Sequence, residues 1–391
     1  MIRTLPSLLK RLAYYGYLDD SSLGDVDNLS DDDLTSVLHG IANNLMARRK
    51  APSWPEARYQ TPDEAFQDCI ARFDGVNLNV EEQEILAQLR PWGSEAYARL
   101  APTFQKRREE GFTVPALGIV NGDVCGDLAV MAAESLSHDQ LRAANVIADR
   151  YLEETGDYAT LRVLIYFIAY VCLYRALEVV NDPESRLAYL REAGWVAEFR
   201  VPYLLIGAGV HGSGKSDFTY AAMKELGGIR IRANVERARI LGKPAANTPE
   251  DFDEVTTEQT YRRMAHITGL LLEAGYPVYI DASSLTRAQR SLLRNEAEAR
   301  GLAVMIVSFE ADQATLEERV TARQRKLGLP IEDGLHILKE QQARFEPFDS
   351  EEQFHLVHLD TTQPDANDTL VALIRENVRI PGTTIPTPSL I

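Results

Sequence analysis

The sequence has 391 residues and a formal net charge of −17 at pH 7. Its content of 45% hydrophobic and 25% charged residues is typical of a globular protein that buries a substantial core. The negative charge disfavours broad binding to long nucleic acids or anionic membranes, because both are themselves negatively charged. At this length we expect two domains or three.

Cysteine usage and apolar runs bear on the cellular compartment. The cysteines Cys69, Cys125 and Cys172 lie far apart and show no metal-binding or redox spacing, so we expect a reduced, cytoplasmic protein. The most apolar run, residues 163–174, is too short to span a bilayer and predicts a buried core helix. No membrane partner is expected.

The first half of the sequence shows mainly helical periodicity. A short strand-and-turn stretch is predicted over residues 112–127, and an apolar helix around residues 160–180. The other predicted helices span residues 61–73, 79–92, 94–111 and 138–154, the last after a capping box of Ser137 and Gln140. We therefore predict a mostly helical N-terminal domain over residues 1–198.

The pattern changes near Pro202, where strands begin to alternate with helices. The predicted strands span residues 202–209, 228–233, 276–282, 302–311 and 352–360, and the predicted helices span residues 217–227, 256–275, 286–301 and 314–328. This alternation predicts an α/β domain with a parallel sheet and helices on both faces. We place this domain at residues 199–375, followed by a flexible tail over residues 376–391.

A glycine-rich motif joins the first predicted strand to the helix after it. Residues 209–216 read Gly-Val-His-Gly-Ser-Gly-Lys-Ser and fit the phosphate-binding pattern G-x-x-x-x-G-K-[ST]. In such a loop, backbone N–H groups and the N-terminus of the following helix bind phosphate oxygens. The residues predicted to bind ATP are Gly209, Val210, His211, Gly212, Ser213, Gly214, Lys215, Ser216 and Asp217.

Further side chains are predicted to act on the nucleotide. Lys215 is expected to reach the β- and γ-phosphates, and the Ser216 hydroxyl to hold Mg²⁺. Asp281 ends the third strand, where it would hold Mg²⁺ through water, although it also fits an N-cap of the next helix. Arg319, Arg323 and Arg325 share one helix, which predicts a cationic lid that stabilises the transferring phosphate. The alternative for these arginines is a solvated face paired with Glu317 and Glu318.

The second half of the chain resembles the small P-loop kinases related to gluconate kinase, polynucleotide 5′-kinases and zeta toxins. The resemblance lies in the stretches GVHGSGKS, RANVERARILG, YPVYIDASSLTRAQR and LEERVTARQRK. It implies a nucleotide-binding kinase fold over about residues 203–360. In these relatives an Asp-x-x-Arg after the second strand supplies the base for the attacking hydroxyl, but here the motif reads Asn234-Val-Glu-Arg237. Asn234 cannot act as that base, whereas Arg237 can still bind an anionic substrate.

More closely, the chain is similar to predicted AAA-type kinase domains that follow an aminoglycoside-phosphotransferase-like domain. The stretches YARLAPTFQKRREEG and DRYLEETGDYATLRVLIYFIAYVCLYRAL carry this second resemblance. It implies a catalytic loop of the form H-G-D-x-x-x-x-N, of which only Asn121-Gly-Asp123 remains. We therefore predict that the N-terminal domain is a truncated, catalytically inactive relative, and the alternative for Asn121-Gly-Asp123 is a tight turn.

Three functions are compatible with these features. The first is an ATP-dependent kinase that phosphorylates a hydroxyl of a small substrate. The second is an ATP-binding switch or slow ATPase whose helical domain binds a protein partner. The third is a zeta-toxin-like or polynucleotide-kinase-like enzyme, which the acidic charge disfavours. The expected ligands are ATP, Mg²⁺ and a small-molecule phosphate acceptor.

Overall fold

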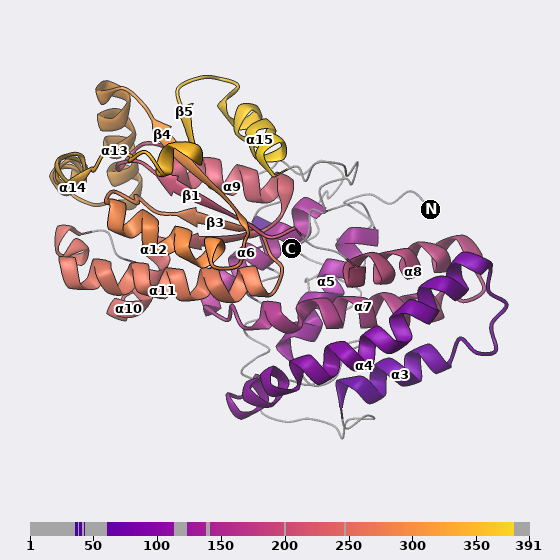
Figure 1. Cartoon of the computed structure of the whole chain (residues 1–391). Coiled ribbons are helices and arrows are strands. Elements are labelled where there is room, and N and C mark those ends of the chain that lie inside the picture. Colours follow the sequence, from indigo (N-terminus) through magenta and orange to yellow (C-terminus); the bar gives the residue numbers. More distant parts are fainter. Residues whose placement is uncertain are drawn as a thin grey trace. The chain divides into compact units, whose positions relative to one another are not determined.

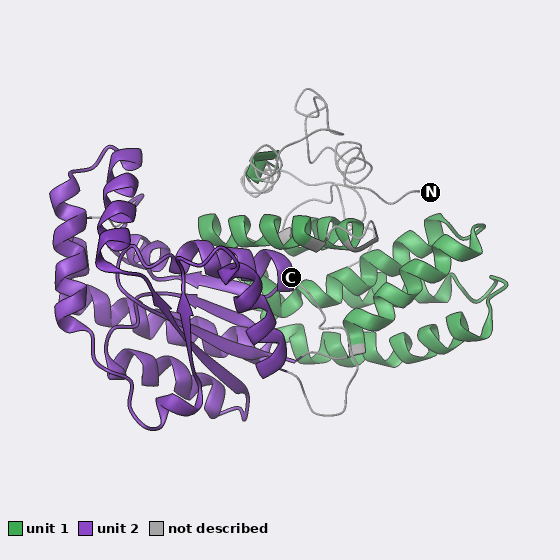
Figure 2. Cartoon of the chain, turned by 90° about the horizontal axis from the view of Figure 1, so that it is seen from above, with its two compact units in different colours: residues 1–199, 391 green, residues 200–390 purple. Residues whose placement is uncertain are grey.

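The computed structural model describes residues 61–112, 123–137, 141–198, 201–245 and 248–378, together with residues 36, 37, 39, 40 and 43. The chain divides into two compact units, one of residues 1–199 with residue 391 and one of residues 200–390 (Figure 2). The N-terminal unit is helical in its described part, and the C-terminal unit contains a five-stranded sheet. The predicted fold class is thus confirmed.

The N-terminal unit contains a set of packed helices (Figure 1). They are α3 (Pro62–Ala71), α4 (Val80–Glu109), α5 (Val124–Ser137), α6 (Leu141–Thr155), α7 (Thr160–Glu178) and α8 (Pro183–Glu198). Among the described helices, α7 alone has the length and apolar composition of a membrane span, yet most of its residues are buried inside the unit. It packs against α4, α5 and α8 and forms the core of this unit, as the apolar run predicted.

Helix α4 is longer than predicted. The sequence analysis predicted two helices separated at Gly93, with Pro91 and Pro102 inside them, but one helix of 30 residues runs through the whole stretch. A proline removes only its own N–H from the helix ladder, and long-range packing can hold the rest. Here a capping box of Asn79 and Glu82 fixes the start, and the helix packs along α7 and α8.

A buried ion cluster accounts for the acidic residue of the predicted catalytic-loop remnant. Arg107 donates to both carboxylate oxygens of Asp123 at 2.8 Å and to Asp157 at 2.7 Å, and all three side chains are almost fully buried. A carboxylate held in this way ties α4 to the start of α5. Asn121 and Gly122 lie outside the described residues, as do Gln140 and its capping box.

The C-terminal unit is built on a parallel sheet with strand order β2-β3-β1-β4-β5. The strands are β1 (Tyr203–Ala208), β2 (Ile229–Arg232), β3 (Val278–Asp281), β4 (Ala303–Glu310) and β5 (Leu356–Asp360). The helices are α9 (Lys215–Leu226), α10 (Ala233–Leu241), α11 (Glu254–Glu273), α12 (Arg287–Glu298), α13 (Gln313–Leu327), α14 (Ile331–Arg344) and α15 (Ala366–Asn377). In a parallel sheet all carboxyl strand ends meet at one edge, and β1, β2 and β3 end there side by side.

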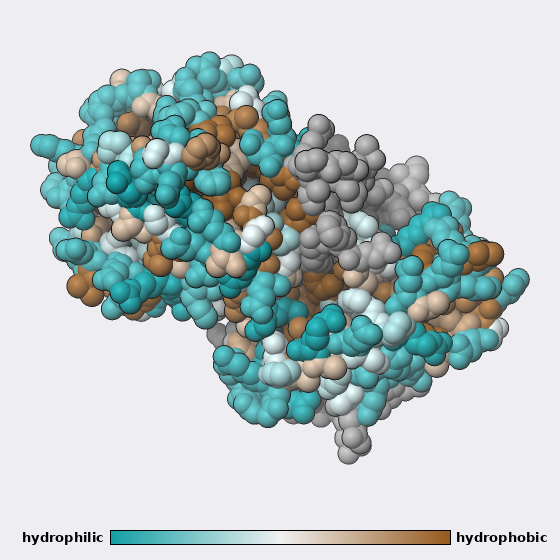
Figure 3. All heavy atoms as spheres, in the orientation of Figure 1, coloured by the Kyte–Doolittle hydropathy of each residue, from teal (hydrophilic) through white to brown (hydrophobic). Residues whose placement is uncertain are grey.

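Helices cover both faces of this sheet (Figure 1). Alternate strand residues such as Leu205, Tyr279 and Val307 pack against α9 and α15. Helix α11 contacts β2 and β3, and α12 contacts β1 and β4. On the side drawn in Figure 3, hydrophilic residues cover most of the surface over α10 to α14. Three helices of this unit were not predicted: α10, α14, and α15, which continues through Glu376 and Asn377, the first residues of the predicted tail.

Candidate functional site

A cavity of about 1480 Å³ lies at the carboxyl edge of the sheet in the C-terminal unit. It is lined by the glycine-rich loop after β1, by the ends of β2 and β3, and by α10, α11, α13 and α14. Eight lysine and arginine side chains line it, against six carboxylates. In a chain with 58 acidic and 41 basic residues, this is a local reversal of charge that favours an anionic ligand.

The glycine-rich loop takes the backbone conformation that its glycines allow. Gly212 and Gly214 have φ values of +84° and +87°, in the left-handed region that side chains rarely adopt. A Cβ on Gly209 would lie 2.7 Å from the carbonyl oxygen of Phe309. Six of the predicted ATP-binding residues line the cavity: His211, Gly212, Gly214, Lys215, Ser216 and Asp217. Gly209, Val210 and Ser213 do not line it.

The loop conformation can be tested by substitution of Gly212. A Cβ there would lie 2.8 Å from the carbonyl oxygen of Leu316, whereas a Cβ on Gly242, which also has positive φ, would contact nothing. In both variants the alanine has to adopt a left-handed backbone conformation, which lowers the free energy of unfolding by about 1–2 kcal/mol. Only Gly212→Ala adds a steric clash, so we expect it to cost about 1–3 kcal/mol more. Hydrogen exchange of the β1 and α9 amides measures the difference, and equal costs would refute this loop geometry.

Lys215 begins α9 and extends back over the loop. Its Nζ donates to the carbonyl oxygen of Val210 at 2.8 Å and to Ser213 Oγ at 3.2 Å. Burial lowers the pKa of Lys215 to about 8, against the opposing effect of Asp281. The ammonium group is therefore satisfied by loop oxygens, and a phosphate that enters the loop provides it with a stronger partner.

Ser216 and Asp281 meet at the edge between β1 and β3. Ser216 Oγ donates to Asp281 Oδ1 at 3.0 Å, and Asp281 Oδ2 accepts from Arg232 Nε at 3.1 Å. Asp281 is the last residue of β3 and lies opposite Arg232 in the register of β2. The alternative prediction for Asp281 is wrong, because Thr286 caps α12 and forms its capping box with Gln289.

The three predicted lid arginines lie on α13 but reach different surroundings. Arg319 lines the cavity, yet its guanidinium donates to Thr361 Oγ1 at 2.8 Å and to the carbonyl oxygen of Gly212 at 3.4 Å. Arg323 lines the cavity one turn later and has no hydrogen bond or ion pair with any described residue. Arg325 is exposed and does not line the cavity. Within the described part of the chain none of the three pairs with the neighbouring glutamates.

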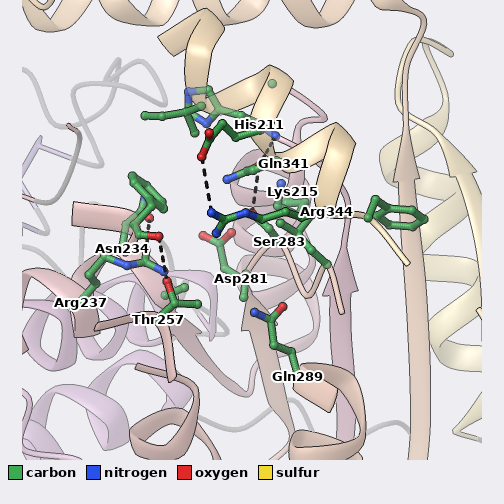
Figure 4. Close-up of a pocket in the computed structure, with 18 of the residues that line it drawn as sticks. His211, Lys215, Asn234, Arg237, Thr257, Asp281, Ser283, Gln289, Gln341 and Arg344 are labelled. Carbon is green, nitrogen blue, oxygen red and sulfur yellow. Dashed lines mark hydrogen bonds and ion pairs between the residues drawn. The ribbon is translucent and has the colours of Figure 1, made fainter. Parts of the chain in front are cut away.

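Asn234 and Arg237 lie together at the start of α10, directly after β2 (Figure 4). Asn234 Oδ1 accepts a hydrogen bond from Arg237 Nη1 at 3.1 Å, and both residues line the cavity. The Arg237 guanidinium lies 4.4 Å from the centre of the Phe252 ring, a cation–π distance. The structure thus brings the predicted acceptor-binding pair to the same cavity as the loop.

Gln341 and Arg344 on α14 are cavity residues that the sequence analysis missed (Figure 4). Gln341 Oε1 accepts the backbone N–H of His211 at 2.8 Å and the Ser283 hydroxyl at 3.3 Å. This side chain therefore connects α14 to both the glycine-rich loop and the segment after β3. The one signal in the sequence was the helical spacing of Leu335, Leu338 and Gln341.

The family comparison matches residues 204–348 to a family described as an AAA domain. This range begins in β1, ends after α14 and includes the cavity, so the predicted AAA-type P-loop domain is confirmed there. No curated protein matches the chain. The match contains no residue of the N-terminal unit. The predicted relation of that unit to aminoglycoside phosphotransferases has no support from the comparisons.

Several solved structures are similar to this chain. A gluconokinase from Sinorhizobium meliloti is 22% identical, and the match covers 46% of this chain and 97% of that protein, with a TM-score of 0.33. A sugar kinase from Janibacter is 19% identical over 45% of this chain and 94% of that one, with a TM-score of 0.35. An APS kinase of Mycobacterium tuberculosis, solved with AMPPNP and APS, is 17% identical over 46% of this chain and 99% of that one, with a TM-score of 0.35.

Proposed function

We propose that the C-terminal unit binds ATP in its glycine-rich loop and transfers the γ-phosphate to a small acceptor in the same cavity. The observation that carries this proposal is the joint placement of Lys215, Ser216 and Asp281 on one side of the cavity and Asn234 with Arg237 on another. A phosphotransferase needs both a phosphate cradle and a place for the acceptor within one cavity. The sequence analysis predicted a hydroxyl as the accepting group.

The residues present fit a magnesium ion. Mg²⁺ prefers oxygen ligands and is usually held by one or two side chains together with substrate phosphates. Ser216 Oγ and Asp281 Oδ1, 3.0 Å apart, offer a hydroxyl and a carboxylate at the start of α9. When bound there, Mg²⁺ would neutralise charge on the β- and γ-phosphates. Arg232 already pairs with the other oxygen of Asp281, so a metal has to compete with this arginine for the carboxylate.

Arg323 is the residue that we assign to the transferring phosphate. It lines the cavity from α13, is partly buried and has no described partner. Burial lowers the pKa of its guanidinium, and the nearby charge of Arg232 lowers it further, against the opposing effects of Asp281 and Asp217. Negative charge that develops on the phosphoryl group during transfer would be stabilised by this guanidinium.

A second candidate is an ATP-binding switch or slow ATPase. It is favoured by Asn234, because an amide at this position cannot take a proton from an acceptor hydroxyl. Gln341 would then report nucleotide binding to α14 through its bond to His211. In this reading a protein partner of the helical unit receives the signal. A zeta-toxin-like or polynucleotide-kinase-like activity stays a third candidate.

The release of ADP from Mg-ATP, measured with and without pools of small metabolites, tests the proposal. A phosphotransferase gives ADP release that one pool stimulates and a phosphorylated product in equal amount. The switch gives slow release that no pool changes and only inorganic phosphate as product. The same assay on Lys215→Met controls for contaminating kinases, since this variant lacks the phosphate-binding lysine.

A further inference from the structure

Asn234 offers a ligand hydrogen-bond donors at the point where the acceptor is expected. Its amide oxygen is engaged by Arg237 at 3.1 Å, which leaves the NH₂ group as the part of the side chain for a ligand. An amide NH₂ only donates hydrogen bonds and takes no proton near neutral pH. This favours an acceptor group that has lone pairs and no proton to lose.

Arg237 beside it is a buried cation that forms no ion pair with any described residue. Its side chain is 4% exposed, and no carboxylate of the described residues lies within ion-pair distance of it. Its Nε also has no hydrogen-bond partner among the described residues. An unpaired buried charge is costly, and an anion that enters the cavity beside it removes that cost.

Neither Asp281 nor His211 replaces the missing base. Asp281 is held by Ser216 and Arg232. Burial lowers the pKa of His211 to about 3, so its imidazole is a poor proton acceptor. Six further titratable side chains of the cavity are solvent-exposed: Asp217, Glu254, Glu258, His336, Glu340 and Glu346, the last of which accepts the backbone N–H of Arg287 at 2.6 Å.

We propose that the accepting group is the dianion of a phosphate monoester and not a hydroxyl, an inference that rests on the phosphotransferase function proposed above. A non-bridging oxygen of this phosphate forms the new bond to the γ-phosphorus. The bond from that phosphorus to the β–γ bridging oxygen breaks, and its electron pair leaves with ADP. The acceptor oxygen carries no proton near pH 7, since the second pKa of such esters is about 6, so no base is required.

The number of oxygens favours a phosphate monoester over a carboxylate. A phosphate monoester has three non-bridging oxygens, so one can attack while two accept from the Asn234 NH₂ group and the Arg237 guanidinium. A carboxylate has two oxygens, and the attacking oxygen leaves a single one for both donors. The paired donors of Asn234 and Arg237 therefore match the larger anion.

Binding to the full-length protein saturated with Mg-AMPPNP tests this inference, because the analogue fills the γ-phosphate position. The probes are phenyl phosphate, benzoate and benzyl alcohol, each titrated by calorimetry. We expect phenyl phosphate to bind at least about tenfold more tightly than the other two, a difference of about 1.4 kcal/mol. Asn234→Asp is expected to weaken the binding of phenyl phosphate by about tenfold or more, because the new carboxylate repels the anion. Arg237→Gln is expected to weaken it by about tenfold or more, because the cation is lost.

The matched control is Arg262→Gln. Arg262 also lines the cavity, but its side chain is 72% exposed and pairs with Glu258 at 2.5 Å, so its loss should change phenyl phosphate affinity less than about twofold. AMPPNP binding by each variant shows that its site is folded.

Two outcomes overturn the inference. In one, AMPPNP-loaded protein binds phenyl phosphate no better than benzyl alcohol or benzoate. In the other, Asn234→Asp leaves phenyl phosphate affinity unchanged or raises it. In both cases Mg-AMPPNP still binds and the proposed function stands. If wild-type protein fails to bind Mg-AMPPNP, the proposed function fails and the acceptor inference falls with it.

Discussion

Arg323→Ala is expected to reduce phosphoryl transfer by about 10²–10³-fold, the usual cost of removing one preorganised transition-state donor. ATP affinity should change less than about threefold, because Lys215 and the loop N–H groups hold the ground-state phosphates. The structural reason is that Arg323 lines the cavity and has no described partner, whereas Arg319 is bonded to Thr361. Single-turnover rates at saturating ATP, together with a separate ATP titration, measure the two quantities.

The control for this variant is Lys339→Ala. Lys339 is an exposed cation on α14 that does not line the cavity, so its loss should change neither rate nor affinity. If Arg323→Ala lowers ATP affinity as much as turnover, Arg323 binds the ground-state phosphate and has no special role in transfer.

Lys215→Met is expected to weaken ATP binding by about 10²-fold, since the ammonium group forms charged contacts worth about 1.5–3 kcal/mol each. In wild-type protein, ATP at about 100 times Kd should stabilise the fold by about 2.7 kcal/mol, and the variant at the same concentration should lose most of this gain. Thermal unfolding with and without Mg-ATP measures the effect. Equal stabilisation of both proteins would place the nucleotide elsewhere.

The pH dependence of ATP affinity gives a second test of Lys215. Burial lowers the pKa of this lysine to about 8, and only its protonated form attracts phosphate. Affinity should therefore be nearly full at pH 7, fall by about half at pH 8 and be about tenfold lower at pH 9 than at pH 7, as the protonated fraction falls. Lys215→Met should show no such fall over this range. A wild-type profile that stays flat would contradict the low pKa of this residue.

The sequence predicted the parts of the site that depend on local pattern. The glycine-rich loop, the strand before it and the helix after it are neighbours in sequence, and the predicted position of Asp281 at the end of a strand is correct. A glycine that requires positive φ and a short, fully buried apolar strand leave clear local signals.

The missed parts depend on contacts between distant segments. Arg232 meets Asp281 because β2 lies beside β3, and no local pattern states the strand order. Gln341 meets His211 across 130 positions, and it lies on a helix that was not predicted. Helix α4 shows the converse error, because the local pattern was divided at Gly93 whereas packing against α7 and α8 keeps the helix continuous.

Hydrogen exchange of the full-length protein with and without Mg-ATP tests the central claim most directly, because it locates the nucleotide along the chain. The account predicts slower exchange in peptides that cover Gly209–Ser216, the end of β3 and the facing turns of α13 and α14. It predicts unchanged exchange in α4 and α7 of the helical unit. Protection confined to the helical unit, or no protection of the glycine-rich loop at saturating Mg-ATP, would contradict it.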